Sequence, residues 1–201
     1  MASKTIKYFK TQIIAGKFKG KTIEIPAIST TRSSKSILRE SLFNTIAFDV
    51  VDANFVELFA GSGSIGLEAL SRGAAKSYFF EKNRTALRLL KDNISAIDPN
   101  GASVFSGDTF NLFPSLYKQL KAEKRATFFY LDPPFSIREG MDDIYNKLIT
   151  LIETIEDPFA TMVIVEHMSE IDLPKTIGKL IQHKQKRFGK STLSYYRFKG
   201  M

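Results

Sequence analysis

The chain of 201 residues contains no cysteine, and its only two histidines, His167 and His183, are far apart in the sequence. Without cysteine, the protein has neither a disulfide framework nor a thiolate zinc site. Two isolated histidines likewise give little basis for a metal site or a catalytic triad. The sequence shows no apolar run of the roughly 18 residues that a membrane span requires, and no leader typical of secretion. These absences favour a cytoplasmic protein that binds neither a metal nor a membrane.

The residues that are abundant point to a compact fold with a basic end. Hydrophobic residues make up 43% of the chain, enough to bury a core in one domain. Of the formal net charge of +8, the first 40 residues supply nine Lys and Arg minus two Glu, or +7, and the remaining 161 residues are close to neutral. A cationic end is typical of proteins that bind a polyanion, although a solvated basic tail is the alternative.

Elements of secondary structure follow from the patterns along the chain. Two short β-rich runs at residues 13–14 and 22–25 flank glycines and predict a basic hairpin. Apolar residues at every fourth position predict a helix over residues 37–48, and Asn83 is expected to cap the start of a later helix. From residue 54, strands and helices alternate five times, and a final antiparallel hairpin follows at about residues 178–198. This order predicts an α/β Rossmann-like sheet of seven strands with helices on both faces, with residues 51–201 as the main domain and 1–50 as a basic hairpin and helix extension.

A glycine loop at residues 57–70, "ELFAGSGSIGLEAL", lies between a strand and a helix and indicates a nucleotide-type cofactor. Its glycines fit G-x-G-x-x-G, and Glu81 lies twenty residues after Gly61, as in dinucleotide-binding folds. Gly61 and Gly63 would let backbone N–H groups approach the ligand, and Glu57 would face an ammonium group of the ligand. Glu81 and Asp108 follow the next two strands, where they would accept hydrogen bonds from ribose hydroxyls and an adenine amino group, unless they are strand-end caps.

The sequence "FFYLDPPFS", residues 128–136, separates the possible cofactors. Two prolines after a buried strand lack N–H donors and fix a stiff turn that presents only acceptors. If Asp132 and the Pro133 carbonyl each accept one N–H of a ring-conjugated amino group, the nitrogen lone pair becomes available for attack on a methyl group. Phe135 would stack on the base. We therefore expect an amino-group methyltransferase, although an ordinary strand-ending turn is the structural alternative.

With these motifs, the sequence resembles the bacterial 16S ribosomal RNA guanine-N2 methyltransferases of the RsmD type. The likeness includes "IIAGKFKGKTIEIP", "TTRSSKSILRESLFNTI", "ELFAGSGSIGLEALSRGA", "YLDPPF" and "RFGKSTLSYYRF". The family usually has proline and threonine where this chain has Ser33 and Ser34, and often arginine at the position of Ile37. These departures leave the roles of Arg32 and Arg39 open between contacts to RNA or the cofactor and helix capping or ion pairing.

The resemblance implies S-adenosylmethionine as cofactor and, as substrate, 16S ribosomal RNA of the small subunit or its assembly intermediate, bound by a monomer. It implies that the guanine amino group is held by Asp132, Pro133, Pro134 and Phe135. The candidate cofactor-binding residues are Glu57, Phe59, Ala60, Gly61, Ser62, Gly63, Glu81, Lys82, Asp108 and Thr109. The candidate RNA-binding residues are Lys17, Lys19, Lys21, Arg32 and Arg39.

Three other functions remain compatible with these motifs. A methyltransferase acting on DNA adenine or on a protein glutamine would use a related turn, although the glutamine enzymes more usually have asparagine at position 132. An NAD-dependent dehydrogenase would use the same glycine loop. An RNA-binding module without catalysis would need only the basic terminus.

Overall fold

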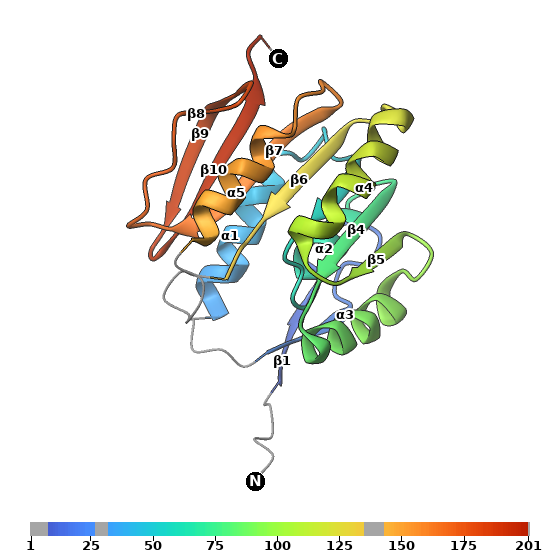
Figure 1. Ribbon diagram of the computed structural model, residues 1–201. Coiled ribbons are helices and arrows are strands. Elements are labelled where there is room, and N and C mark those ends of the chain that lie inside the picture. The colour runs from blue at the N-terminus through green and yellow to red at the C-terminus, as the bar shows by residue number, and fades with distance from the viewer. Residues whose placement is uncertain (1–7, 27–31, 135–142, 201) are drawn as a thin grey trace, which may run out of the picture.

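The computed structural model describes residues 8–26, 32–134 and 143–200, which form a central sheet with helices on both faces (Figure 1). The strands are β1 (Tyr8–Gln12), β2 (Thr22–Pro26), β3 (Asn54–Glu57), β4 (Lys76–Glu81), β5 (Ala102–Ser106), β6 (Thr127–Leu131), β7 (Ala160–Met168), β8 (Thr176–Ile177), β9 (Leu180–Phe188) and β10 (Ser191–Phe198). The helices are α1 (Arg32–Thr45), α2 (Ser64–Ser71), α3 (Arg84–Ile97), α4 (Thr109–Glu123) and α5 (Ile144–Glu153). Among these described residues, no helix has the length and apolar content that a membrane crossing needs.

The main sheet has the strand order β5-β4-β3-β6-β7-β10-β9-β8. The five strands from β5 to β7 are parallel, and β10 inserts antiparallel between β7 and β9. The seven strands expected from the sequence are therefore all present, and the two-residue β8 adds an eighth. We call the side where the parallel strands end the carboxyl edge and the opposite side the amino edge. Ligands of such sheets bind at the carboxyl edge.

Apolar side chains from alternate strand positions fill the core on the two faces of the sheet. On one face, Leu42 and Phe43 of α1 pack in a cluster with Phe128 of β6. On the other face, the neighbouring Phe129 packs with residues of α4 and α5, because successive strand residues point to opposite faces. The domain boundary expected after residue 50 therefore separates two parts that share one core.

The amino-terminal hairpin is present, but its first strand begins earlier than the sequence indicates. The prediction of a strand at residues 13–14 is wrong, because the N–H groups of Ile14 and Ala15 donate to the carboxylate of Glu68 instead of to a strand. The N–H of Lys17 donates to the carbonyl of Ser71, the last residue of α2. Since α2 starts at the carboxyl edge and ends at the amino edge, the turn of the hairpin lies at the amino edge.

Helix α1 also starts earlier than expected, at Arg32 instead of residue 37, and ends at Thr45. Its polar first turn carries no apolar repeat that would reveal it. The cap of α3 is as the sequence predicts, since the Asn83 side chain accepts hydrogen bonds from the N–H groups of Thr85 and Ala86.

Candidate active site

The glycine loop connects β3 to α2 at the carboxyl edge, in the middle of the parallel strands. Gly61 and Gly63 have φ of 53° and 77°, a conformation that side chains rarely adopt. A Cβ atom on Gly61 would meet nothing within 4 Å, whereas one on Gly63 would lie 2.5 Å from Cδ1 of Leu90. The loop therefore leaves open space beside Gly61 and packs tightly at Gly63.

The two glycine N–H groups are used within the protein. The N–H of Gly61 donates to Oε2 of Glu81 at 2.8 Å, and that of Gly63 donates to the Ala60 carbonyl at 2.7 Å. These two N–H groups are therefore not available to a ligand, and the approach of other backbone N–H groups of the loop to a cofactor stays a prediction. What the glycines provide is room for a ligand to approach the backbone, because they carry no side chain.

Glu57 ends β3, and its side chain is buried. Oε2 of Glu57 accepts the Gly66 N–H at 2.8 Å, at the start of α2. Burial raises the pKa of Glu57 to about 8, although the N–H groups of Gly66 and Ile65 oppose this shift. The carboxylate therefore holds the loop to the helix, and its contact with a cofactor ammonium group stays a prediction.

Glu81 and Asp108 lie at the carboxyl ends of β4 and β5, which are neighbours in the sheet. The carboxylate of Glu81 accepts the N–H groups of both Gly61 and Asn83, so it is fixed beside the glycine loop. Asp108 caps α4 by accepting the Phe110 N–H at 3.0 Å, and its Oδ2 lies 3.4 Å from Nζ of Lys82. The structure thus brings together the predicted ribose and adenine acceptors, and each also has the capping role that we considered as its alternative.

The other predicted cofactor residues line or support this region. The ring of Phe59 contacts that of Phe110 edge to face, with centroids 5.9 Å apart. Ser62 is buried, and its carbonyl accepts a hydrogen bond from Asn93. The Thr109 hydroxyl donates to the Leu58 carbonyl and ties α4 to the end of β3.

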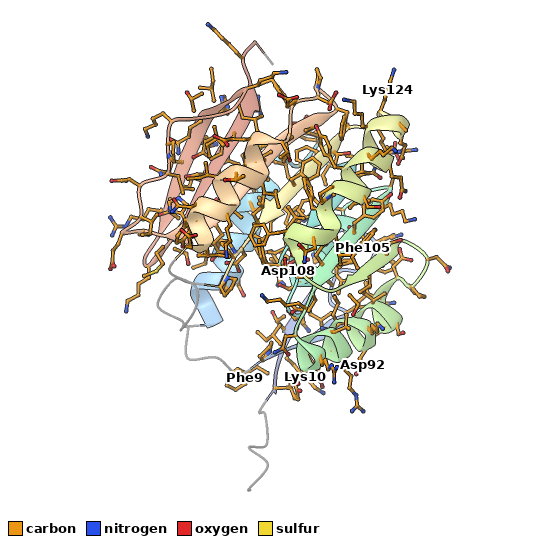
Figure 2. The ribbon with its side chains drawn as sticks, viewed as in Figure 1. Phe9, Lys10, Asp92, Phe105, Asp108 and Lys124 are labelled. Atoms are coloured by element: carbon orange, nitrogen blue, oxygen red, sulfur yellow. The ribbon has the colours of Figure 1, made fainter. Side chains whose placement is uncertain are left out.

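A cleft of about 700 Å³ begins at Lys82 and Asp108 and extends between α4 and α5. Its walls include the side chain of Phe110. Figure 2 shows Asp108 and Lys124 at opposite ends of α4, so the end of the cleft that includes Asp108 lies at the carboxyl edge. It adjoins the predicted cofactor residues of β4 and β5 but does not include the glycine loop.

The turn after β6 presents acceptors at the same edge, because β6 pairs directly with β3. The side chain of Asp132 is 30% exposed, so it is not turned into the interior. In the described part of the chain, the Pro133 carbonyl accepts no hydrogen bond. Both features are required for Asp132 and Pro133 to accept N–H groups from a substrate. Phe135 lies outside the described residues.

An ionic network behind Asp132, in which Glu166 is the only fully buried charged group, was not expected from the sequence. Nζ of Lys35 lies 2.6 Å from Oε1 of Glu166 and 3.1 Å from Oδ2 of Asp132. The Tyr130 hydroxyl donates to the other oxygen of Glu166. Burial alone would lower the pKa of Lys35, but the charges of Asp132 and Glu166 outweigh this and raise it.

One signal in the sequence pointed to this network. Lys35 precedes Leu38 by three residues and Leu42 by seven, so it starts on the same side of α1 as these two buried leucines, although its own side chain is 43% exposed. From this position its Nζ reaches Glu166, the buried carboxylate that needs a cationic partner.

The predicted RNA-binding residues are only partly brought together, since Lys19 and Arg39 line one cavity of about 370 Å³. Lys17, Lys19 and Lys21 are exposed on the hairpin turn at the amino edge, where Lys17 pairs with Asp98 at 3.0 Å. Contact of these lysines with RNA stays a prediction and requires RNA that reaches this edge. Arg32 begins α1, and its side chain is outside the described structure.

Of the roles that the sequence left open for Arg39, the structure shows contacts within the fold. It is buried, donates to the Gln12 carbonyl at 2.8 Å, and its Nε lies 3.9 Å from Oε2 of Glu68. The prediction that Arg39 contacts RNA is therefore wrong, because its guanidinium is enclosed in the fold.

The family described as "Conserved hypothetical protein 95" matches residues 11–197. The Ribosomal RNA small subunit methyltransferase D of Escherichia coli (strain K12) is 30% identical to the chain, and the match covers 92% of this chain and 88% of the relative. The chain therefore belongs to the family described as "Conserved hypothetical protein 95". Among solved structures, yhhF from Escherichia coli is 29% identical, with a TM-score of 0.74, and the match covers 96% of this chain and all of that one.

A more distant structure, SMU.776 complexed with S-adenosylhomocysteine, is 10% identical to the chain with a TM-score of 0.66. The match covers 98% of this chain and 57% of that one, and at this identity it shows the shared fold alone. Family membership and the methyltransferase fold that the sequence predicts are thus confirmed. In the described residues, no group of three or more His, Asp or Glu is arranged to hold a metal ion.

Proposed function

We propose that the protein transfers a methyl group from S-adenosylmethionine to the N2 amino group of a guanine in 16S ribosomal RNA of the small subunit. The observation that carries this proposal is the pair of acceptors at the end of β6, Asp132 and the Pro133 carbonyl, beside the glycine loop. Family membership supports the RNA substrate, and the acceptor pair supports an amino group as the methyl acceptor.

The residues at the carboxyl edge fit S-adenosylmethionine. Gly61 leaves open space above the loop, and the carboxylates of Glu81 and Asp108 follow at the ends of the next two strands. These residues would hold the cofactor, with Glu81 toward the ribose and Asp108 toward the adenine. When bound, S-adenosylmethionine supplies an electrophilic methyl group on a sulfonium.

Asp132 and Pro133 prepare the guanine amino group for attack. An amino group conjugated to a ring is a poor nucleophile because its lone pair is delocalised. When Asp132 and the Pro133 carbonyl each accept one N–H, the nitrogen becomes pyramidal and its lone pair is directed away from the ring. The nitrogen releases one proton after it gains the methyl group, and Asp132 is the residue that we expect to accept it. Positioning of this kind is worth roughly 7–11 kcal/mol.

A guanine inside a stacked helix is out of reach, so the target nucleotide must leave the stack before it binds. Pro133 is buried and Pro134 is partly buried, which makes the turn a stiff wall for the extruded base. The predicted stacking of Phe135 on this base stays a prediction.

The test is to incubate the protein with labelled S-adenosylmethionine and small ribosomal subunits from cells that lack this methyltransferase. We expect the label in N2-methylguanosine after the RNA is digested to nucleosides. Label found only in adenosine, in DNA or in a ribosomal protein would contradict the proposal. Mass mapping of the RNA would then identify the modified nucleotide.

A further inference from the structure

The chain has a second basic block at its carboxyl end. From Leu173 to Met201 it contains eight Lys and Arg and no Asp or Glu, which gives +8. Residues 41–172 contain 12 basic and 19 acidic residues, which gives −7. The formal charges of these two segments nearly cancel. The near-neutral sum beyond residue 40 therefore hides a carboxyl-terminal block that is as cationic as the amino terminus.

The fold places one end of this block beside the active site. Strand β9 runs in the same direction as β7, because both pair antiparallel with β10. The hairpin between β9 and β10 therefore lies at the carboxyl edge (Figure 1). Ser169, next to the end of β7, donates hydrogen bonds from its N–H to the Lys190 carbonyl and from its hydroxyl to the Gly189 carbonyl, both at 2.9 Å.

Three cations of this hairpin are exposed, and we call them the β9–β10 tip: Lys184, Arg187 and Lys190. No carboxylate of the described residues pairs with any of the three. By contrast, Nζ of Lys186 is engaged with the hydroxyls of Ser41 at 2.9 Å and Thr45 at 3.1 Å. The tip therefore presents positive charge that the protein does not neutralise, whereas Lys186 fastens β9 to α1.

We propose that the β9–β10 tip binds phosphates of the substrate RNA next to the nucleotide held in the active site. This inference rests on the proposed function, because it assigns the surface that grips the same RNA. Cations that neutralise phosphates release condensed counterions, and this gain makes the binding sensitive to salt. Arg187 and Lys190 of the tip share the carboxyl edge with Asp132, and Lys184 lies further back along β9, level with Ile164 in the middle of β7. The lysines of the amino-terminal turn, by contrast, lie at the amino edge.

Lysines on the unpaired outer strand of a sheet can also serve a different purpose, which is to prevent that strand from pairing with a strand of another molecule. Most of β9 is such a strand, because β8 pairs only with Leu180 and Ile181. This role predicts no change in RNA affinity when the charges are removed, so the two explanations give different results.

The experiment compares two triple variants that remove equal charge. The tip variant is Lys184→Gln/Arg187→Gln/Lys190→Gln. The control is Lys118→Gln/Lys121→Gln/Lys124→Gln, three exposed lysines at the end of α4 on the amino edge. Binding of a short fluorescent RNA duplex is measured over a series of salt concentrations, and methyl transfer to undermethylated small subunits is measured in parallel.

We expect the slope of log affinity against log salt to fall in magnitude by about 2 to 3 for the tip variant, since each lost phosphate contact removes about 0.7–0.9. Its KM for subunits should rise about tenfold or more, with kcat little changed, while the control stays close to the unmodified protein. Equal slopes for the two variants, or association of the tip variant into oligomers without a loss of RNA affinity, would overturn the inference.

The outcome is separable from that of the proposed function. Absence of N2-methylguanosine with an intact difference in slopes would refute the reaction but retain the RNA surface. N2-methylguanosine formed by the tip variant with an unchanged KM would refute the surface and retain the reaction.

Discussion

Nζ of Lys35 lies 2.6 Å from Oε1 of Glu166, although 131 residues separate the two along the chain. The same nitrogen lies 3.1 Å from Oδ2 of Asp132. One cation is therefore shared by a carboxylate of the sheet and by the proposed catalytic carboxylate. Without it, two negative charges would face each other beside the buried Glu57.

Replacing Lys35 by methionine should make methyl transfer sensitive to acid. Two neighbouring carboxylates without a cation retain a proton more strongly, and a protonated Asp132 is a poorer acceptor for the guanine N–H. We expect the rate of the Lys35→Met variant to fall at a higher pH than that of the unmodified protein, by about one pH unit or more. Lys35→Arg, which keeps the charge, is the control. The measurement is kcat/KM against pH, and parallel profiles for all three proteins would contradict this role.

Replacing Asp132 by alanine should lower kcat by about 100-fold or more, the usual range for a lost proton acceptor. The affinity for S-adenosylhomocysteine should change little, because the predicted cofactor contacts are at the ends of β3, β4 and β5. Isothermal titration and single-turnover kinetics separate the two effects. Unchanged turnover in Asp132→Ala would remove this residue from the mechanism.

Patterns within short segments were sufficient to predict the sheet, the glycine loop and the Asn83 cap, because periodicity and capping are local properties. Interactions between distant segments were not predictable in this way. The Lys35–Glu166 pair and the enclosure of Arg39 both depend on how α1 packs against the sheet. The use of the Gly61 N–H within the protein was not predictable for the same reason, since its partner Glu81 comes from the next strand.

The glycine loop offers two substitutions that should lower stability by different amounts. Gly61→Ala adds a methyl group to open space, so it should cost only about 1 kcal/mol for the left-handed backbone while it lowers cofactor affinity. Gly63→Ala adds the same backbone cost and a clash with Leu90, so it should cost about 1–3 kcal/mol more. Thermal unfolding and titration with S-adenosylhomocysteine test both. A Gly61→Ala variant with full cofactor affinity would place the cofactor elsewhere.

Replacing Arg39 by alanine should destabilise the fold without changing the contact with RNA. The buried carboxylate of Glu68 would lose one cation, although Arg72 still pairs with it at 2.8 Å. We expect a loss of about 3 kcal/mol, near the lower end for a broken buried ion pair, measured by urea unfolding. The salt dependence of RNA binding should stay the same under conditions in which the variant is folded. A weaker salt dependence with unchanged stability would restore Arg39 to the RNA-binding surface.

Glu57 should make the stability of the protein without cofactor depend on pH. Burial raises its pKa from 4.5 to about 8, so the folded state binds the proton more strongly than the unfolded state does. The contribution of Glu57 to stability is therefore greatest below about pH 4.5, and it is lost as the pH rises to about 8.

Glu57→Gln keeps an acceptor for the Gly66 N–H but removes the charge. We expect this variant to gain stability relative to the unmodified protein as the pH rises through this window, by up to about 5 kcal/mol if the whole shift is expressed. The measurement is the free energy of unfolding of both proteins across the window, and a constant difference between them would show that Glu57 does not titrate there.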